Sequence, residues 1–226
     1  MNTTSPVTKP TLTYFNLIGR AEVARLMLED AGADYHFVPV ANWAEWSSDK
    51  ARLTAAGKLA FGQVPLYEEP DGFTLVQSNA IARHVARKLG FNGADAHEEA
   101  LIDQANEGVV DIIAVMAEPI FRTPAARQTE AKQKLVRETL PAHLAMFEKL
   151  LEKNGNRGFL VGAKLSYADL HLWVSLELVF ARVEGSRDAL LGAFPAVKKL
   201  VEVVSERERI KAYTTRDVYT TTTTNV

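Results

Sequence analysis

Tyr14 is the side chain from which chemistry in this chain is most easily argued, because it lies near the end of a short predicted strand. The apolar, β-prone run Thr11–Phe15 predicts that strand. Tyr14 and Phe15 are adjacent, so their side chains face opposite sides of a sheet. One of them packs in the core, and the other lies near a strand carboxyl end, where open α/β sheets bind ligands. Spacing alone leaves both a packing role and a ligand-facing role open for Tyr14.

A second candidate is the dipeptide Gln77–Ser78, which lies where a predicted strand passes into a predicted helix. The N-terminus of a helix presents free N–H groups and a partial positive charge, so it favours a carboxylate or a phosphate. Serine is also a favoured N-cap residue. The dipeptide is therefore either an anion site or a plain helix start.

The run Ser166-Tyr167-Ala168-Asp169 fits a capping box, in which Ser166 accepts a hydrogen bond from the N–H near Asp169 and Asp169 bonds back. No histidine lies at a motif-like position beside it. We interpret Ser166 as a helix-nucleating residue and not as a catalytic serine.

The composition excludes several kinds of chemistry. There is no cysteine, which excludes disulfides, a thiol nucleophile and thiolate metal sites. The five histidines are scattered without metal-ligand spacing, so no metal site is expected. A net charge of −2 gives no basic excess for nucleic acid, and no apolar run approaches the ~18 residues of a membrane span. We expect a cytoplasmic protein whose thiol chemistry, if any, comes from a bound molecule.

The elements around these residues alternate between strands and helices up to residue 89. A helix over Arg20–Ala31 and a strand over Tyr35–Val40 form a β-α-β unit with Thr11–Phe15, and its two strands are expected to be parallel. Residues 41–61 are interpreted as an irregular or partly helical connection. The predicted hairpin and the helix after it comprise strands Gln63–Glu68 and Gly72–Val76, the turn Pro70-Asp71-Gly72 and the helix Ser78–Leu89. Pro65 fits either an edge proline or a cis bond.

From residue 97 the pattern changes to long helices. Apolar residues recur at steps of three and four up to Met116, and Pro119 bends or ends that helix. Further helices are predicted over Ala125–Lys153, kinked near Pro141, and over Ser166–Arg182 and Pro195–Arg207. The chain thus divides into an α/β domain over residues 10–89, a linker over 90–96, an all-helical domain over 97–219 and a flexible Thr-rich tail over 220–226.

Four motifs, in this order and spacing, resemble a cytosolic glutathione transferase: LTYFNLIGRAEVARL, QVP, LVQSNAIARHVARKLG and SYAD. The resemblance runs from about Leu12 to Tyr219, is of the tyrosine type, and is closest to the pi and sigma classes. It implies a thioredoxin-like N-terminal domain with a mixed four-stranded sheet, followed by an all-helical domain that forms the electrophile site.

The resemblance also implies the site residues. Tyr14 matches the tyrosine that hydrogen-bonds the glutathione sulfur, and Pro65 matches the cis-proline of the family. Val64 then pairs its backbone with the cysteinyl part of glutathione. The remaining implied glutathione contacts are Gln77 and Ser78 with Arg20 at the γ-glutamyl end, Gln63 with Trp46 and Lys50 at the glycyl end, and Asp111 from a partner subunit. Trp43 or Lys58 could replace Trp46 or Lys50.

Three departures from the family pattern stand out. The stretch from Trp46 to Gln63 is several residues longer than in pi or sigma members. Phe121 stands where pi members often carry a hydroxylated aromatic, which leaves assistance to epoxides or Michael acceptors in doubt. Ile18 stands where an arginine is common. We expect an apolar electrophile pocket lined by Phe15, Leu17 and Phe121.

The expected function is conjugation of the glutathione thiolate to hydrophobic electrophiles, with Tyr14 stabilising the thiolate. Glutathione is then a co-substrate, no cofactor is permanently bound, and the protein is a homodimer. One alternative is a glutathione-dependent isomerase similar to the sigma-type prostaglandin synthases. Another is a non-catalytic binding or structural protein of the same fold, as in lens crystallins.

Overall fold

The N-terminal part of the protein is built on one mixed sheet. The computed structural model describes residues 8–40 and 43–216. The sheet has the order β2-β1-β3-β4. Its strands are β1 Thr11–Phe15, β2 His36–Val40, β3 Leu66–Glu68 and β4 Thr74–Val76. β1 runs parallel to β2 and antiparallel to β3, and β3 pairs antiparallel with β4, as the sequence predicts.

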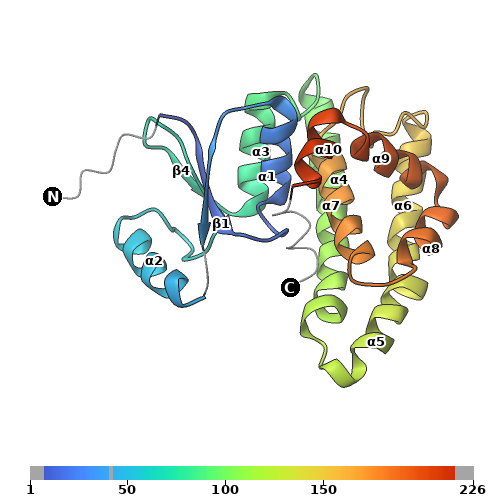
Figure 1. Ribbon diagram of the computed structural model, residues 1–226. Coiled ribbons are helices and arrows are strands. Elements are labelled where there is room, and N and C mark those ends of the chain that lie inside the picture. Colours follow the sequence, from blue (N-terminus) through green and yellow to red (C-terminus); the bar gives the residue numbers. More distant parts are fainter. Residues whose placement is uncertain (1–7, 41–42, 217–226) are drawn as a thin grey trace.

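Helices cover both faces of this sheet (Figure 1). Helices α1 (Glu22–Ala31) and α3 (Ser78–Leu89) lie on one face, and α2 (Trp43–Ala55) lies on the other. Leu12 and Tyr14, two residues apart on β1, belong to the core cluster on the α1 and α3 side. Trp46 and Leu53 of α2 belong to a smaller cluster on the opposite face. The alternation expected for β1 directs Phe15 toward the α2 cluster, although its ring also meets the ring of Tyr14 edge-on.

Two strand starts in this domain need correction, and one open alternative is decided. Within residues 41–61, where the sequence left an irregular and a partly helical connection open, residues 43–55 form a helix. Only Trp46 and Leu53 of that helix are buried, so its periodic signal in the sequence is weak. Strand β3 begins at Leu66 and not at Gln63, because Pro65 just before it has no N–H to donate to the ladder. Strand β4 begins at Thr74, two residues later than predicted.

The C-terminal part is all-helical, as predicted, but it contains more elements than the sequence suggested. Its helices are α4 Ala96–Ala117, η1 Glu118–Arg122, α5 Ala125–Lys134, η2 Leu135–Thr139, α6 Leu140–Lys153, α7 Tyr167–Phe180, α8 Ser186–Ala193, α9 Pro195–Ser205 and α10 Glu208–Thr214. The short helices α8 and α10 were not predicted. Helix α4 begins inside the segment that we interpreted as a linker.

Two π-helical turns lie next to prolines in this domain. In η1, whose second residue is Pro119, the N–H and the hydroxyl of Thr123 both donate to the carbonyl of Glu118. Instead of the single kinked helix predicted over Ala125–Lys153, η2 separates α5 from α6, and Pro141 follows it. A proline has no N–H for the carbonyl four residues earlier, so regular helical hydrogen bonding is interrupted at both places: Pro119 lies inside η1, and Pro141 lies just after η2.

The capping box predicted at the start of α7 is present. Ser166 Oγ accepts a hydrogen bond from the N–H of Asp169 at 3.4 Å, and Asp169 Oδ2 accepts from the N–H of Ser166 at 2.7 Å. Asp169 Oδ1 also accepts from the N–H of Leu160 at 2.7 Å. Both side chains are buried, so this N-terminus is closed by its own residues.

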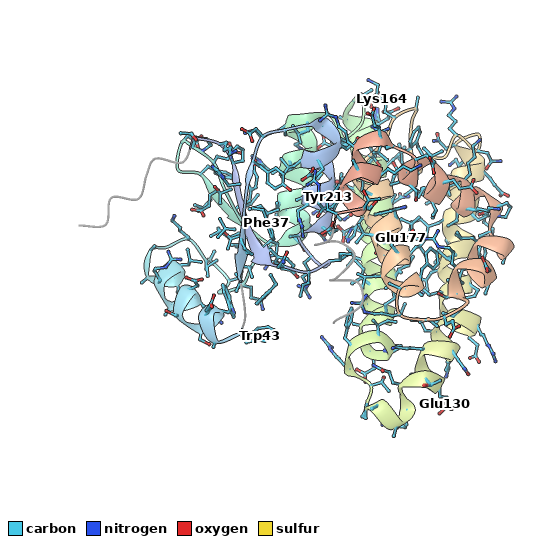
Figure 2. All side chains as sticks on the ribbon, in the orientation of Figure 1. Phe37, Trp43, Glu130, Lys164, Glu177 and Tyr213 are labelled. Atoms are coloured by element: carbon cyan, nitrogen blue, oxygen red, sulfur yellow. The ribbon has the colours of Figure 1, made fainter. Side chains whose placement is uncertain are left out.

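The two parts of the chain share one hydrophobic core, which runs from β1 and α1 into α4 and α7. Arg207 binds Asp30 with two hydrogen bonds of 2.8 and 2.6 Å and so joins the segment before α10 to α1. The guanidinium of Arg25 lies 4.4 Å from the ring of Phe37 and 5.4 Å from that of Tyr213; both rings are labelled in Figure 2.

The structure does not test the predicted boundaries of the two domains. The domain bounds 10–89 and 97–219 stay predictions, and the predicted tail 220–226 lies outside the described residues. Among residues 8–40 and 43–216, no helix is long and apolar enough to cross a membrane.

Candidate active site

A hollow lies where β3, α1 and α3 converge, and we call it the strand-end hollow. It is lined by Arg20, Phe61, Gln63, Val64, Pro65, Val76, Gln77 and Ser78. The chain brings together here six of the residues that the sequence analysis singled out, from three separate segments. Phe61 and Val76 were not predicted, although Phe61 stands two residues before the QVP motif.

Tyr14 lies beside the strand-end hollow and is connected to it through Arg20. The hydroxyl oxygen of Tyr14 accepts a hydrogen bond from the backbone N–H of Arg20 at 3.1 Å. Burial raises the pKa of Tyr14, while this hydrogen bond and the charge of Arg20 oppose the rise. The phenol therefore stays protonated at neutral pH, and its own proton is left to donate to another acceptor.

The bond between Val64 and Pro65 is cis, which decides between the two interpretations that the sequence left open for Pro65. The pairing of β3 with β1 ends at Leu66, so Val64 lies outside the ladder. Its backbone groups are therefore placed at the hollow and are not used by the sheet. An extended ligand could pair with them as a short added strand.

The N-terminus of α3 is held open at the strand-end hollow. Gln77, the N-cap residue, has φ 77° and ψ 111°, and no side chain caps the first turn. A positive φ is unfavourable for a residue with a side chain, so the local structure must hold Gln77 in place. Ser78 makes no side-chain hydrogen bond within the described part of the chain, and both side chains line the hollow. The free N–H groups of this turn favour an anion.

Arg20 and Lys50 supply cationic groups that are free to bind a ligand. Both side chains are exposed, and neither forms an ion pair among residues 8–40 and 43–216. Lys50 lies over Gly62, because a Cβ added to Gly62 would be 3.6 Å from Lys50 Nζ. The ammonium group is thus next to Gln63. Lys58, the alternative to Lys50, binds Glu68 at 2.6 Å.

The two tryptophans of α2 occupy different environments. Trp46 is 8% exposed and packs in the small core cluster under the sheet. Trp43 is 74% exposed, and its ring centroid lies 4.8 Å from that of Phe15. Figure 2 shows Trp43 at the lower end of α2. Neither indole lines the strand-end hollow, so the glycyl contact predicted for Trp46 stays a prediction.

The residues expected to line an electrophile pocket are not all in contact. Phe15 and Leu17 pack against the core near Tyr14, and the rings of Phe15 and Tyr14 are 5.7 Å apart. Phe121 is 51% exposed on η1, where the guanidinium of Arg182 lies 5.4 Å from its ring. Phe121 makes no ring contact with Phe15 within the described residues. Asp111 is exposed on α4 and does not line the hollow.

The fold and site together define a two-domain protein of the thioredoxin-like transferase type. A mixed four-stranded sheet with a cis-proline before β3 is followed by an all-helical domain. Residues 10–87 match the family model of the glutathione S-transferase N-terminal domain, and residues 110–217 match that of the C-terminal domain. The chain belongs to the glutathione S-transferase family, and its architecture is that of a glutathione S-transferase enzyme.

Individual relatives agree over nearly the whole chain. Glutathione S-transferase A1 of Bos taurus is 39% identical over 208 residues, which cover 91% of this chain and 87% of that protein. Glutathione S-transferase A1 of Homo sapiens is 36% identical over 208 residues, with the same coverage. The pi-class glutathione S-transferase of Onchocerca volvulus has 32% identity and a TM-score of 0.78, covering 91% of this chain and 92% of that one.

A second similar solved structure carries the name of a different activity. Prostaglandin synthase D of Nilaparvata lugens has 26% identity and a TM-score of 0.76, covering 92% of this chain and 98% of that one. The similar proteins therefore include one named as pi-class and several named with the letter A or alpha, such as glutathione S-transferase alpha-1 of Rattus norvegicus. The sequence motifs predicted the pi or sigma class, and that finer assignment stays a prediction.

Proposed function

We propose that this protein conjugates the thiolate of glutathione to hydrophobic electrophiles, and that Tyr14 stabilises the thiolate. The observation that carries the proposal is the hydrogen bond from the Arg20 N–H to the Tyr14 hydroxyl oxygen at 3.1 Å. That bond occupies the oxygen as an acceptor and leaves the hydroxyl proton for a sulfur. Arg20 also lines the strand-end hollow, so the residue that holds the Tyr14 hydroxyl is also part of the proposed ligand site.

One such donor is sufficient in magnitude. A free thiol has a pKa of ~8.5, so only a few per cent is thiolate at pH 7. Lowering that pKa by about two units would ionise most of the bound thiol, and it corresponds to about 2.7 kcal/mol. A hydrogen bond to a charged group supplies ~1.5–3 kcal/mol. The charge of Arg20 adds to this, and no cysteine of the protein is needed.

The rest of glutathione fits the remaining groups by charge and by backbone pairing. The γ-glutamyl carboxylate is assigned to the open first turn of α3, with Gln77, Ser78 and the unpaired Arg20. The cysteinyl backbone is assigned to Val64, beside the cis bond to Pro65. The glycyl carboxylate is assigned to Lys50 and Gln63. Lys50 is favoured over Lys58 because Lys58 is already paired with Glu68.

The electrophile and the quaternary structure complete the proposal. We assign an apolar electrophile to the side of Tyr14 near Phe15 and Leu17, with Phe121 approaching from the helical domain. A homodimer is proposed in which Asp111, exposed on α4, reaches the glutathione amino group bound to the other subunit. No permanently bound cofactor is required. A cytoplasmic location is part of the same proposal.

Two assays on purified protein test the proposal, namely retention on immobilised glutathione and turnover of an aryl halide. Tyr14→Phe should keep retention and lower turnover about 10-fold or more, because it removes one preorganised donor. The pKa of the bound thiol, followed by thiolate absorbance, should rise towards that of free glutathione. Tyr35→Phe is the matched control, because Tyr35 donates to Glu29 away from the hollow. Full turnover in Tyr14→Phe removes Tyr14 from the role.

The pH dependence gives a second readout. Because burial raises the pKa of Tyr14, the phenol stays protonated through the neutral and mildly alkaline range. Turnover should therefore rise as the bound thiol ionises and then stay level to about pH 9. A falling limb between pH 7 and 9 that disappears in Tyr14→Phe would contradict a neutral Tyr14.

A glutathione-dependent isomerase is the second candidate, favoured by the similarity to prostaglandin synthase D of Nilaparvata lugens. It would use the same glutathione site, and only the apolar pocket would differ. Turnover of a prostaglandin endoperoxide without turnover of aryl halides would favour it. Retention on glutathione with no turnover of either substrate would favour a non-catalytic binding protein.

A further inference from the structure

Gly19 stands where an added side chain would meet the Tyr14 hydroxyl. A Cβ placed on Gly19 would lie 2.9 Å from Tyr14 Oη, 2.9 Å from Leu17 Cδ1 and 3.4 Å from Tyr14 Cε1. A Cβ essentially never lies within 3.0 Å of a non-bonded carbon or oxygen, so the two shorter distances are overlaps. Gly19 is not among the described glycines with positive φ. Glycine is therefore needed at this position for space and not for backbone conformation.

The Tyr14 side of this contact has little freedom to move. The ring of Tyr14 is buried and meets the ring of Phe15 edge-on, with an interplanar angle of 75°. Its hydroxyl accepts the N–H of Arg20, the residue that follows Gly19. The carbonyl of Gly19 accepts the N–H of Glu22 at 3.0 Å, which fixes this peptide at the start of α1. Leu17 Cδ1 is the end of a flexible side chain and can rotate away, so the overlap falls on Tyr14.

We propose that Gly19 is a positioning residue whose missing side chain lets the Tyr14 hydroxyl lie against the Gly19–Arg20 peptide and face a glutathione sulfur. The inference rests on the proposed function, because the sulfur is the acceptor for the hydroxyl proton. Gly19 acts only through Tyr14 and is not itself a catalytic residue. A methyl group at this position would push Oη off the Arg20 N–H and away from the sulfur.

Gly19→Ala tests the inference. A misplacement of about 1 Å costs ~100-fold in rate, so kcat should fall between about 10-fold and 100-fold. The pKa of the bound glutathione thiol should rise, while the KM for glutathione should change little, because the contacts of the strand-end hollow are untouched. Gly192→Ala is the matched control, since nothing lies within 4 Å of a Cβ there and its φ is not positive. It should leave kcat and the thiol pKa unchanged.

A double-variant cycle separates the contact with Tyr14 from any general effect on the fold. In the Tyr14→Phe background the oxygen is absent, so Gly19→Ala should lower turnover less than about twofold and cost less thermal stability than it does alone. Equal losses of turnover and stability in the two backgrounds would overturn the inference. It would also be overturned if the pKa of the bound thiol in Gly19→Ala equalled that in the unchanged protein. If Gly19→Ala alone fails to fold, the double variant should fold, and its failure would also overturn the inference.

The same cycle distinguishes this inference from the proposed function. The stability coupling between Gly19 and Tyr14 is measured without glutathione, so it reports the contact alone. Full turnover in Tyr14→Phe with strong coupling would contradict the function proposed for Tyr14 and leave the contact intact. Reduced turnover in Tyr14→Phe with no coupling would overturn the role of Gly19 alone.

Discussion

Helices α3 and α7 both begin beside a serine, but only the first turn of α7 is closed by side chains. At α7, Ser166 and Asp169 cap each other, and both are buried. At α3, Gln77 has a positive φ, no side chain caps the turn, and Ser78 lines the strand-end hollow. A helix N-terminus with its own cap contributes stability, and one without a cap keeps its N–H groups for a ligand.

The difference lies in what surrounds each serine and not in the serine itself. Asp169 follows Ser166 by three residues and turns back to it, whereas Ile81 stands at the corresponding position after Ser78. Asp169 also receives the N–H of Leu160 from the preceding loop, which ties that loop to α7. We therefore expect substitutions at the start of α7 to lower folding stability, and substitutions at the start of α3 to lower ligand affinity.

The largest expected effect is on stability at α7. Asp169→Ala leaves three donors without their acceptor, namely the N–H groups of Leu160 and Ser166 and the Ser166 hydroxyl. Each buried unsatisfied group costs ~1–3 kcal/mol, so the free energy of unfolding should fall by about 3 kcal/mol or more in chemical denaturation. Asp188→Ala, which removes an exposed first-turn acid from α8, is the control and should change stability by less than about 0.5 kcal/mol.

An intermediate effect separates the two serines. Ser78→Ala should weaken glutathione binding about 10-fold, since a hydrogen bond to a charged group contributes ~1.5–3 kcal/mol, with little change in unfolding. Ser166→Ala should lower the free energy of unfolding by about 1 kcal/mol and leave glutathione affinity unchanged. Calorimetric titration with glutathione measures the affinity of each variant, and chemical denaturation measures its free energy of unfolding. If both serines changed the same property, the contrast between the two N-termini would fail.

The smallest expected effect concerns the backbone of Gln77. Gln77→Gly should raise the free energy of unfolding by up to about 1 kcal/mol by relieving the positive φ, while lowering glutathione affinity through loss of the side chain. Asn156, the other described non-glycine residue with a positive φ, is the control. Asn156→Gly should also raise the free energy of unfolding, but it should leave the affinity for glutathione unchanged. A loss of stability in Gln77→Gly would show that its conformation is not strained.

Local signals were enough to predict several elements with their observed bounds. The strand Thr11–Phe15 and the helix Ser78–Leu89 have clear starts and stops, and Gly90 ends the helix in a left-handed conformation, as its position predicts. The hairpin turn was also predicted, and Asp71 accepts the N–H of Phe73 in it. Helices α2, α8 and α10 were not predicted as regular helices because few of their residues are buried.

The candidate site was predicted in part. Motif order placed Tyr14, Arg20, Pro65 and Gln77–Ser78 together, and the structure brings all of these except Tyr14 into the lining of one hollow. The segment of residues 43–58 could not be resolved in the same way, because its two tryptophans and two lysines are alike in type. Their surroundings differ only once the chain is folded, with Trp46 in a core cluster and Lys58 bound to Glu68.

By itself, the sequence determined the order of the elements, the two-part α/β and all-helical organisation, and the absence of a thiol nucleophile. These properties follow from hydrophobic periodicity, turn residues and composition, which act over a few residues. Only the tertiary structure decided that the Tyr14 hydroxyl accepts the Arg20 N–H and that Gly19 leaves room for it. Distances of 2.9 and 3.1 Å depend on how β1 passes into α1, and no pattern of residue types specifies them.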